Sequence, residues 1–203
     1  MTKTTMTLAL TALLLGSLAL GCGGGKTVTR LETDSQTDLS GQWNDTDSRL
    51  VAQEMISDCV SRPWLTEFAA ATGGKPVVTI GTVHNETSEH INMGTFLSDF
   101  ERELINAGSV RFVASKESRS EIREERQEQQ EFASRETAKR MREETGADFI
   151  LQGAVKTITD QEGGKRVTFY QTDLELINIE SMEKVWIGSK KIKKGISQGK
   201  TKW

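Results

Sequence analysis

The sequence has few of the residues that mark several protein classes. Its 203 residues include only two cysteines, two prolines and one tyrosine, and 26 basic against 29 acidic side chains leave a net charge of −3. Two cysteines exclude a disulfide scaffold and a cysteine-rich zinc site. The near balance of charge excludes a dominant polybasic arm, so we expect no nucleic-acid partner. The length fits one domain with appendages.

The one long apolar run lies at the N-terminus. Residues 6–20 carry no charge, follow Lys3 and precede a Gly-Cys-Gly sequence at 21–23. A membrane-spanning helix needs roughly 20 apolar residues, whereas a basic residue, a short apolar core and small residues are typical of a signal peptide. We therefore interpret residues 1–21 as a signal peptide.

The cysteine that follows indicates a lipid anchor. Its setting resembles the lipobox of bacterial lipoproteins, in which Cys22 becomes the first mature residue and is acylated, although Ala19 stands where Leu is usual. An incidental cysteine after an ordinary signal peptide is the alternative. Several acyl chains hold a protein stably at a membrane, and Gly23, by resemblance to enterobacterial sorting rules, favours the outer membrane. We expect a periplasmic protein that is lipid-anchored to the outer membrane.

The mature chain divides at changes in composition. Residues 22–45 are polar and acidic and predict a flexible tether. Residues 46–194 carry regular apolar spacing and predict the folded domain, which leaves residues 195–203 as a basic tail.

The C-terminal residues from Lys184 onward contain seven lysines and no acid. They read either as a solubilising tail or as a surface for anionic phospholipid, an anionic glycan polymer, an acidic partner or the chain's own acidic tether. Trp203 beside Lys200 and Lys202 would suit a membrane interface.

The spacing of apolar residues predicts an α+β domain. Helices are expected over residues 45–62, 64–72 and 95–107, with Thr95 as a cap, and in two highly charged pieces over 115–145 that Gly146 closes. Strands are expected over residues 77–83, 110–113, 149–159, 166–178 and 184–192, with a hairpin loop at 160–165. This order predicts one mixed sheet of about five strands flanked by helices, ending in a β-meander.

Three segments together resemble a known family: VVTIGTVHNETSEHINMGTFLSDFERELINAGSVRFVAS, SRETAKRMREETGADFILQGAV and LELINIESMEKVWIG. Their order and spacing are similar to the LpoB family of outer-membrane lipoproteins, with a wider relationship to the curli secretion lipoprotein and the TolB N-terminal domain. Each motif also has a structural reading, with Gly146 as a helix cap and Trp186 as a core residue. Familiar members of the family carry a long Pro-rich tether. In this chain the expected tether is short and contains no proline.

The resemblance implies a function without catalysis. Members of the family activate class A penicillin-binding proteins, so we expect the chain to bind such a synthase and shift it toward its active state. The alternative is a structural or secretion-associated envelope lipoprotein without that role. It predicts long alternating hairpins, and none of the expected strands is unusually long. An enzyme or solute binder is a further alternative that would need a polar pocket.

Candidate partner-binding residues come from the charged segment. Drawn as a helix, residues 116–131 place glutamates on one face and Arg119, Arg123 and Arg126 on the other. Like charges four residues apart weaken an isolated helix, so the pattern favours charged partners, unless the helix is simply solvated. The pairs Glu136–Arg140, Lys139–Glu143 and Arg140–Glu144 favour a second helix. The resemblance implies that the intervening SRETA segment, residues 134–138, corresponds to a partner-facing part of the family, which adds Arg135.

No motif for catalysis is present. The sequence contains no G-x-S-x-G, P-loop or G-x-G-x-x-G motif. His84 and His90, with Glu86 and Glu89 between them, lack the spacing of a zinc site and read as a solvated loop. Cys59 lies on an apolar helix stripe, so we expect a buried thiol. We therefore expect no enzyme, no metal and no cofactor.

Overall fold

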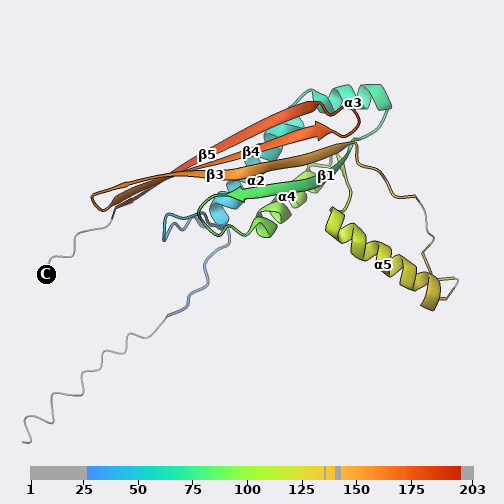
Figure 1. The fold of residues 1–203 in the computed structure, drawn as a ribbon, viewed down its shortest axis with the longest axis horizontal. Coiled ribbons are helices and arrows are strands. Elements are labelled where there is room, and N and C mark those ends of the chain that lie inside the picture. Colours follow the sequence, from blue (N-terminus) through green and yellow to red (C-terminus); the bar gives the residue numbers. More distant parts are fainter. Residues whose placement is uncertain (1–26, 135, 140–142, 198–203) are drawn as a thin grey trace, which may run out of the picture. The chain divides into compact units, whose positions relative to one another are not determined.

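The computed structural model describes residues 27–134, 136–139 and 143–197 (Figure 1). The chain forms two units, Met1–Ser35 and Gln36–Trp203. In the described part of the first, the Ser35 hydroxyl donates to the Glu32 carbonyl over 2.7 Å. Within the described residues, no helix is long and apolar enough to cross a membrane.

Capping residues set the ends of three helices. Helix α2, Asp45–Ser61, begins in a capping box between Asn44 and Asp47 and stops before Pro63. Helix α3, Trp64–Thr72, ends at a left-handed glycine, as does helix α4, Met93–Ala107. Helix α4 starts before the expected Thr95, because the Asn92 side chain caps it by accepting the Thr95 amide over 3.3 Å.

The sheet confirms the α+β prediction. Its strands are β1 (Val77–Glu86), β2 (Arg111–Phe112), β3 (Phe149–Glu162), β4 (Lys165–Asn178) and β5 (Lys184–Ser197), in the order β2-β1-β3-β4-β5. Strand β1 pairs in parallel with β2 and β3, since helical connections separate them. Strands β3, β4 and β5 form the expected antiparallel meander.

The last three strands are longer than expected. Each has 14 residues, because the hairpin between β3 and β4 narrows to Gly163 and Gly164, both at positive φ. Strand β1 ends where Glu86 pairs with Lys156. Beyond that pair the three strands continue as a ribbon (Figure 1). The expectation that no strand is unusually long is therefore wrong.

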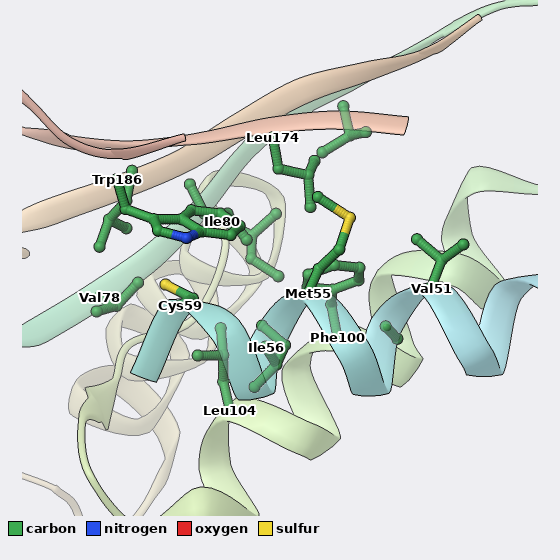
Figure 2. Close-up of a cluster of buried hydrophobic side chains, with 14 of the residues drawn as sticks. Val51, Met55, Ile56, Cys59, Val78, Ile80, Phe100, Leu104, Leu174 and Trp186 are labelled. Atoms are coloured by element: carbon green, nitrogen blue, oxygen red, sulfur yellow. The ribbon is translucent and has the colours of Figure 1, made fainter. Parts of the chain in front are cut away.

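Helices α2 and α4 cover one face of the sheet and build the core (Figure 2). Met55 and Cys59 of α2 face Leu174 and Trp186 of the sheet, and each of these four side chains is buried. Trp186 is thus a core residue, as expected, and its ring nitrogen donates to Asp58 over 2.8 Å. The Trp186 ring lies against Gly188 of β5, where a larger residue would clash with it, and this contact explains the Trp-x-Gly spacing.

Residues 36–44, which we term the strap, pack against the domain although the sequence predicts a flexible tether there. The Trp43 ring lies 5.6 Å from Tyr170 and 6.0 Å from Phe96, centroid to centroid. Lys194 of β5 binds Asp38 of the strap and Asp47 of α2, with both N–O distances 2.6 Å. A lysine of the basic segment thus contacts Asp38, an acid of the expected tether, which is one of the alternatives for these lysines.

Candidate partner-binding surface

The charged helix predicted for residues 116–131 forms and stands largely in solvent. Helix α5, Lys116–Phe132, begins at Ser115, whose side chain accepts the Ser118 amide, and it buries no residue. The glutamates predicted to share one face are all exposed and form no ion pair within the described residues: Glu117, Glu121, Glu124, Glu125, Glu128 and Glu131. A helix without buried residues contributes little to the core, so α5 is available to a partner.

The opposite face of α5 gathers its arginines around a carboxylate of the same chain. Both oxygens of Glu144 accept from Arg123, over 2.7 Å from Nε and 2.8 Å from Nη2. An Nη atom of Arg126 lies 4.0 Å from Glu144. The hydrogen bond from Arg123 lowers the pKa of Glu144, and the same bond raises the pKa of Arg123.

The prediction of a second charged helix before Gly146 is wrong for the described residues. Residues 136–139 and 143–147 have no helical structure, so Gly146 closes no helix. The Lys139 amide instead donates to the Gln129 side chain, while the Gln130 side chain donates to the Lys139 carbonyl. Pairs four residues apart stabilise a helix by only a few tenths of a kcal/mol each, and the contacts to α5 replace them.

A groove separates α5 from the segment that Glu144 holds against it. Its volume is about 830 Å³, and it is lined by Val113, Ala114, Arg119, Glu121, Ile122, Glu125, Arg126, Gln129, Lys139, Glu143, Glu144 and Thr145. Ile122 is 44% exposed in this wall. The Nε atom of Arg119 is buried without a hydrogen-bond partner among the described residues. Apolar, cationic and anionic side chains therefore line one concave surface, and the anionic ones include Glu121 and Glu125 of α5.

The structure brings three of the predicted site residues together. Arg119, Arg123 and Arg126 lie on one face of α5 beside the groove, whereas Arg135 and Cys22 lie outside the described residues. Sequence reasoning missed Glu144 as their partner. No local pattern identifies it, because 21 residues separate it from Arg123.

The loop between β1 and α4 is more ordered than the expected solvated loop. The side chain of Glu89 is 8% exposed, accepts the Tyr170 hydroxyl over 2.7 Å and accepts the Trp43 amide over 3.0 Å. No cluster of three potential metal ligands occurs among the described residues. Cys59 is a buried free thiol, as expected, and burial raises its pKa to about 12.

Comparison with solved structures gives matches of low identity. The LpoB C-terminal domain from Salmonella enterica is 15% identical over 64% of this chain and 93% of its own, with a TM-score of 0.34. LpoB from E. coli is 14% identical over 86% of this chain and 87% of its own, with a TM-score of 0.36. The lipoprotein GNA1162 from Neisseria meningitidis is 15% identical over 59% of this chain and 83% of its own, with a TM-score of 0.40.

The family assignment comes from the sequence itself. No curated protein matches the chain significantly. The sequence profile described as peptidoglycan-synthase activator LpoB matches residues 47–192, which include all three segments that carry the resemblance. Because this match spans more than half of the chain, the protein belongs to the LpoB family.

Proposed function

We propose that the protein is an outer-membrane-anchored periplasmic lipoprotein that binds and allosterically activates a class A penicillin-binding protein. The observation that carries this proposal is the match of residues 47–192 to the family of peptidoglycan-synthase activators. The absence of any recognisable catalytic motif from the sequence fits a regulatory role. The lipid on Cys22 would raise the local concentration of the domain at the membrane.

The surface best suited to the synthase is the groove beside α5. Its arginines would meet carboxylates of the partner, because Glu144 satisfies only part of their hydrogen-bonding capacity. Exposed Ile122 would supply an apolar contact in its lining. Binding there would favour the active conformation of the synthase only if the active form binds more tightly than the inactive form.

The decisive experiment is a reconstitution with the synthase. The chain from residue 22 onward, with Cys22→Ser, is added to the class A synthase of the same envelope, and binding and glycan polymerisation are measured. We expect a complex and a faster rate. Arg119→Ala together with Arg126→Ala should weaken both, while Arg62→Ala, a surface arginine of α2's C-terminal boundary, should not. No complex, or a complex without acceleration, would overturn the proposal.

The lipid anchor has its own test. Replacing Cys22 with serine in the full chain should release the protein from the membrane fraction, because the acyl acceptor is lost. The control is Cys59→Ser, which removes the buried thiol and leaves the lipobox intact. Retention of the Cys22→Ser protein on membranes would contradict the anchor.

The length of the last three strands favours a second candidate function. Strands of 14 residues are what a structural or secretion-associated envelope lipoprotein related to the curli secretion component would need. That role requires no effect on a synthase. The reconstitution therefore separates the two candidates by its rate measurement.

A further inference from the structure

One face of the ribbon formed by β3, β4 and β5 is not used by the core. Along β4, Thr168, Tyr170 and Thr172 are buried toward the helices and the strap, so the residues between them point to the opposite face. There Phe169 pairs across the strands with Ile158 on β3 and with Lys193 on β5. Ile158 is 70% exposed. An apolar row thus lies on the uncovered face of the ribbon.

The lysines of β5 divide between the two faces. Lys190 and Lys194 point toward the helices and bind Glu54 and the Asp38–Asp47 pair respectively. Lys191 and Lys193 alternate with them, are exposed, and form no ion pair within the described residues. The ribbon face therefore presents two free ammonium groups beside its apolar row.

The acids on the same face are mostly occupied or distant from β5. Asp173 binds Lys156 over 3.3 Å, and Glu175 binds Lys184 over 2.5 Å. Asp160 and Glu162 lie on β3 near the hairpin turn, and Glu162 pairs in register with Lys165 of β4. Strand β5 itself carries no acid. The positive charge is therefore concentrated along the β5 side of the ribbon.

Both ends of the domain meet this part of the ribbon. The strap reaches it at Gly41, which lies directly against Ile196 of β5, and at Asp38 on Lys194. Asp38 is the sixteenth residue after Cys22, which limits the distance between them to about 55 Å. The residues that follow Ser197 read QGKTKW, adding two lysines and a tryptophan to the sequence at this end. A membrane anchor on Cys22 would thus keep the ribbon near the bilayer.

We propose that the ribbon face built from Ile158, Phe169, Lys191 and Lys193 docks on an anionic phospholipid surface. The apolar row enters the headgroup region, and the lysines bind lipid phosphates. Weak affinity is sufficient, because the proposed anchor supplies a high effective concentration. The inference goes beyond the proposed function and rests on it only for this proximity.

Docking in this way leaves the candidate partner surface free. Strand β3 starts at Phe149, directly after the segment that binds α5, and ends at the hairpin turn. Its 14 residues span about 45 Å. The groove beside α5 and the docking face therefore lie toward opposite ends of one strand, so a membrane and a partner can be bound together.

The test uses the chain from residue 22 onward with Cys22→Ser, so neither an acyl chain nor a synthase takes part. Vesicles of phosphatidylethanolamine with phosphatidylglycerol are compared with vesicles of phosphatidylcholine by co-sedimentation. We expect binding to the anionic vesicles only, weakened by salt. Lys191→Ser with Lys193→Ser should lower the partition coefficient about tenfold or more. Ile158→Ser should lower it severalfold.

Matched variants separate this face from charge or apolarity in general. Lys190→Ser removes one positive charge from the other face of β5. Ile187→Ser removes an isoleucine, 65% exposed, that lies on the same face of the sheet but outside the ribbon, where β5 pairs with Glu175. Both should bind vesicles as the parent chain does. Equal binding to phosphatidylcholine, no binding, or binding insensitive to the docking variants would overturn the proposal. The proposal would also be overturned if a soluble anionic glycan bound the chain as strongly as the anionic vesicles do and Ile158→Ser did not weaken that binding. None of these results bears on synthase activation.

Discussion

Arg123 holds Glu144 by two parallel hydrogen bonds, of 2.7 and 2.8 Å, across 21 residues of sequence. This pair decides which face of α5 is turned toward its own chain. The arginine face meets the segment around Glu144, and Glu121 and Glu125 line the groove beside it. The other glutamates of α5 are exposed outside the groove: Glu117, Glu124, Glu128 and Glu131. The charge segregation in the sequence is therefore satisfied within the chain on one side only.

Replacing Arg123 with alanine should loosen the segment around Glu144 without destabilising the domain. Ion pairs between exposed side chains contribute little to the free energy of unfolding, but this one fixes residues that have no secondary structure. Amide hydrogen exchange at Lys139, whose amide donates to the Gln129 side chain, should quicken while the melting temperature stays unchanged. Arg102→Ala, which removes the Asp99 pair on α4, is the matched control. The exchange of Arg123→Glu with Glu144→Arg should restore protection, and a failure to do so would contradict direct pairing.

The same pair should respond to acid in one direction. The hydrogen bond from Arg123 holds the pKa of Glu144 below its usual value. Its contribution is therefore complete above the ordinary carboxyl range and is lost as the pH falls through the lowered pKa. The protection factor of the Lys139 amide, which corrects for the intrinsic effect of pH on exchange, should fall only in acid. In the Arg123→Ala variant it should be low at every pH, because the pair is already absent.

Lys194→Gln should be strongly destabilising although it lies in a segment that resembles a solvated tail. The Lys194 side chain is 11% exposed and Asp47 is 6% exposed, so the change leaves a buried carboxylate without its cation. We expect a loss of roughly 2–4 kcal/mol in urea unfolding. Lys190→Gln breaks a more exposed pair, in which Lys190 is 27% and Glu54 62% exposed, and should cost under about 1 kcal/mol. Equal effects of the two changes would contradict a buried role for Lys194.

Two glycines of β5 should differ in their tolerance of alanine. A Cβ atom on Gly188 would lie 2.2 Å from the Trp186 ring, whereas one on Gly195 meets nothing within 4 Å. Gly188→Ala should therefore lower the free energy of unfolding by roughly 1–3 kcal/mol, as overpacking does. Gly195→Ala should change it by less than about 0.5 kcal/mol. Equilibrium urea unfolding of both variants checks this prediction.

Tyr170→Phe should destabilise the domain and abolish a pH dependence. The Tyr170 hydroxyl donates a hydrogen bond to the buried carboxylate of Glu89. Its removal should lower the free energy of unfolding by roughly 1.5–3 kcal/mol. Burial, together with the bond to Glu89, raises the pKa of Tyr170. The folded chain then keeps the proton that the unfolded chain loses, so stability should fall as the pH rises above about 10.

The single tyrosine makes that prediction directly measurable. Phenolate absorbance should appear at the ordinary pH in denaturant and at a higher pH in the folded chain. Coincident titrations in the two states would contradict the contact with Glu89.

Most of the core elements could be predicted from local patterns. The stripe that includes Met55 and Cys59 indicates α2, and Pro63 and Gly108 mark helix ends, because these signals depend on neighbours in sequence. The charged segment after α5 could not be predicted in this way. Its favourable local pairs are weak, and a residue of α5 competes for Glu144.

The sequence alone determined the family, the α+β class and the burial of Trp186 and Cys59, since periodic apolar burial dominates the free energy of folding. Only the tertiary structure decided that polar segments next to the two termini pack against the domain. Trp43 becomes part of the domain because Phe96 and Tyr170 cover it, and Lys194 is buried because Asp38 and Asp47 compensate its charge. Such partners lie up to 156 residues apart, so no local pattern records them.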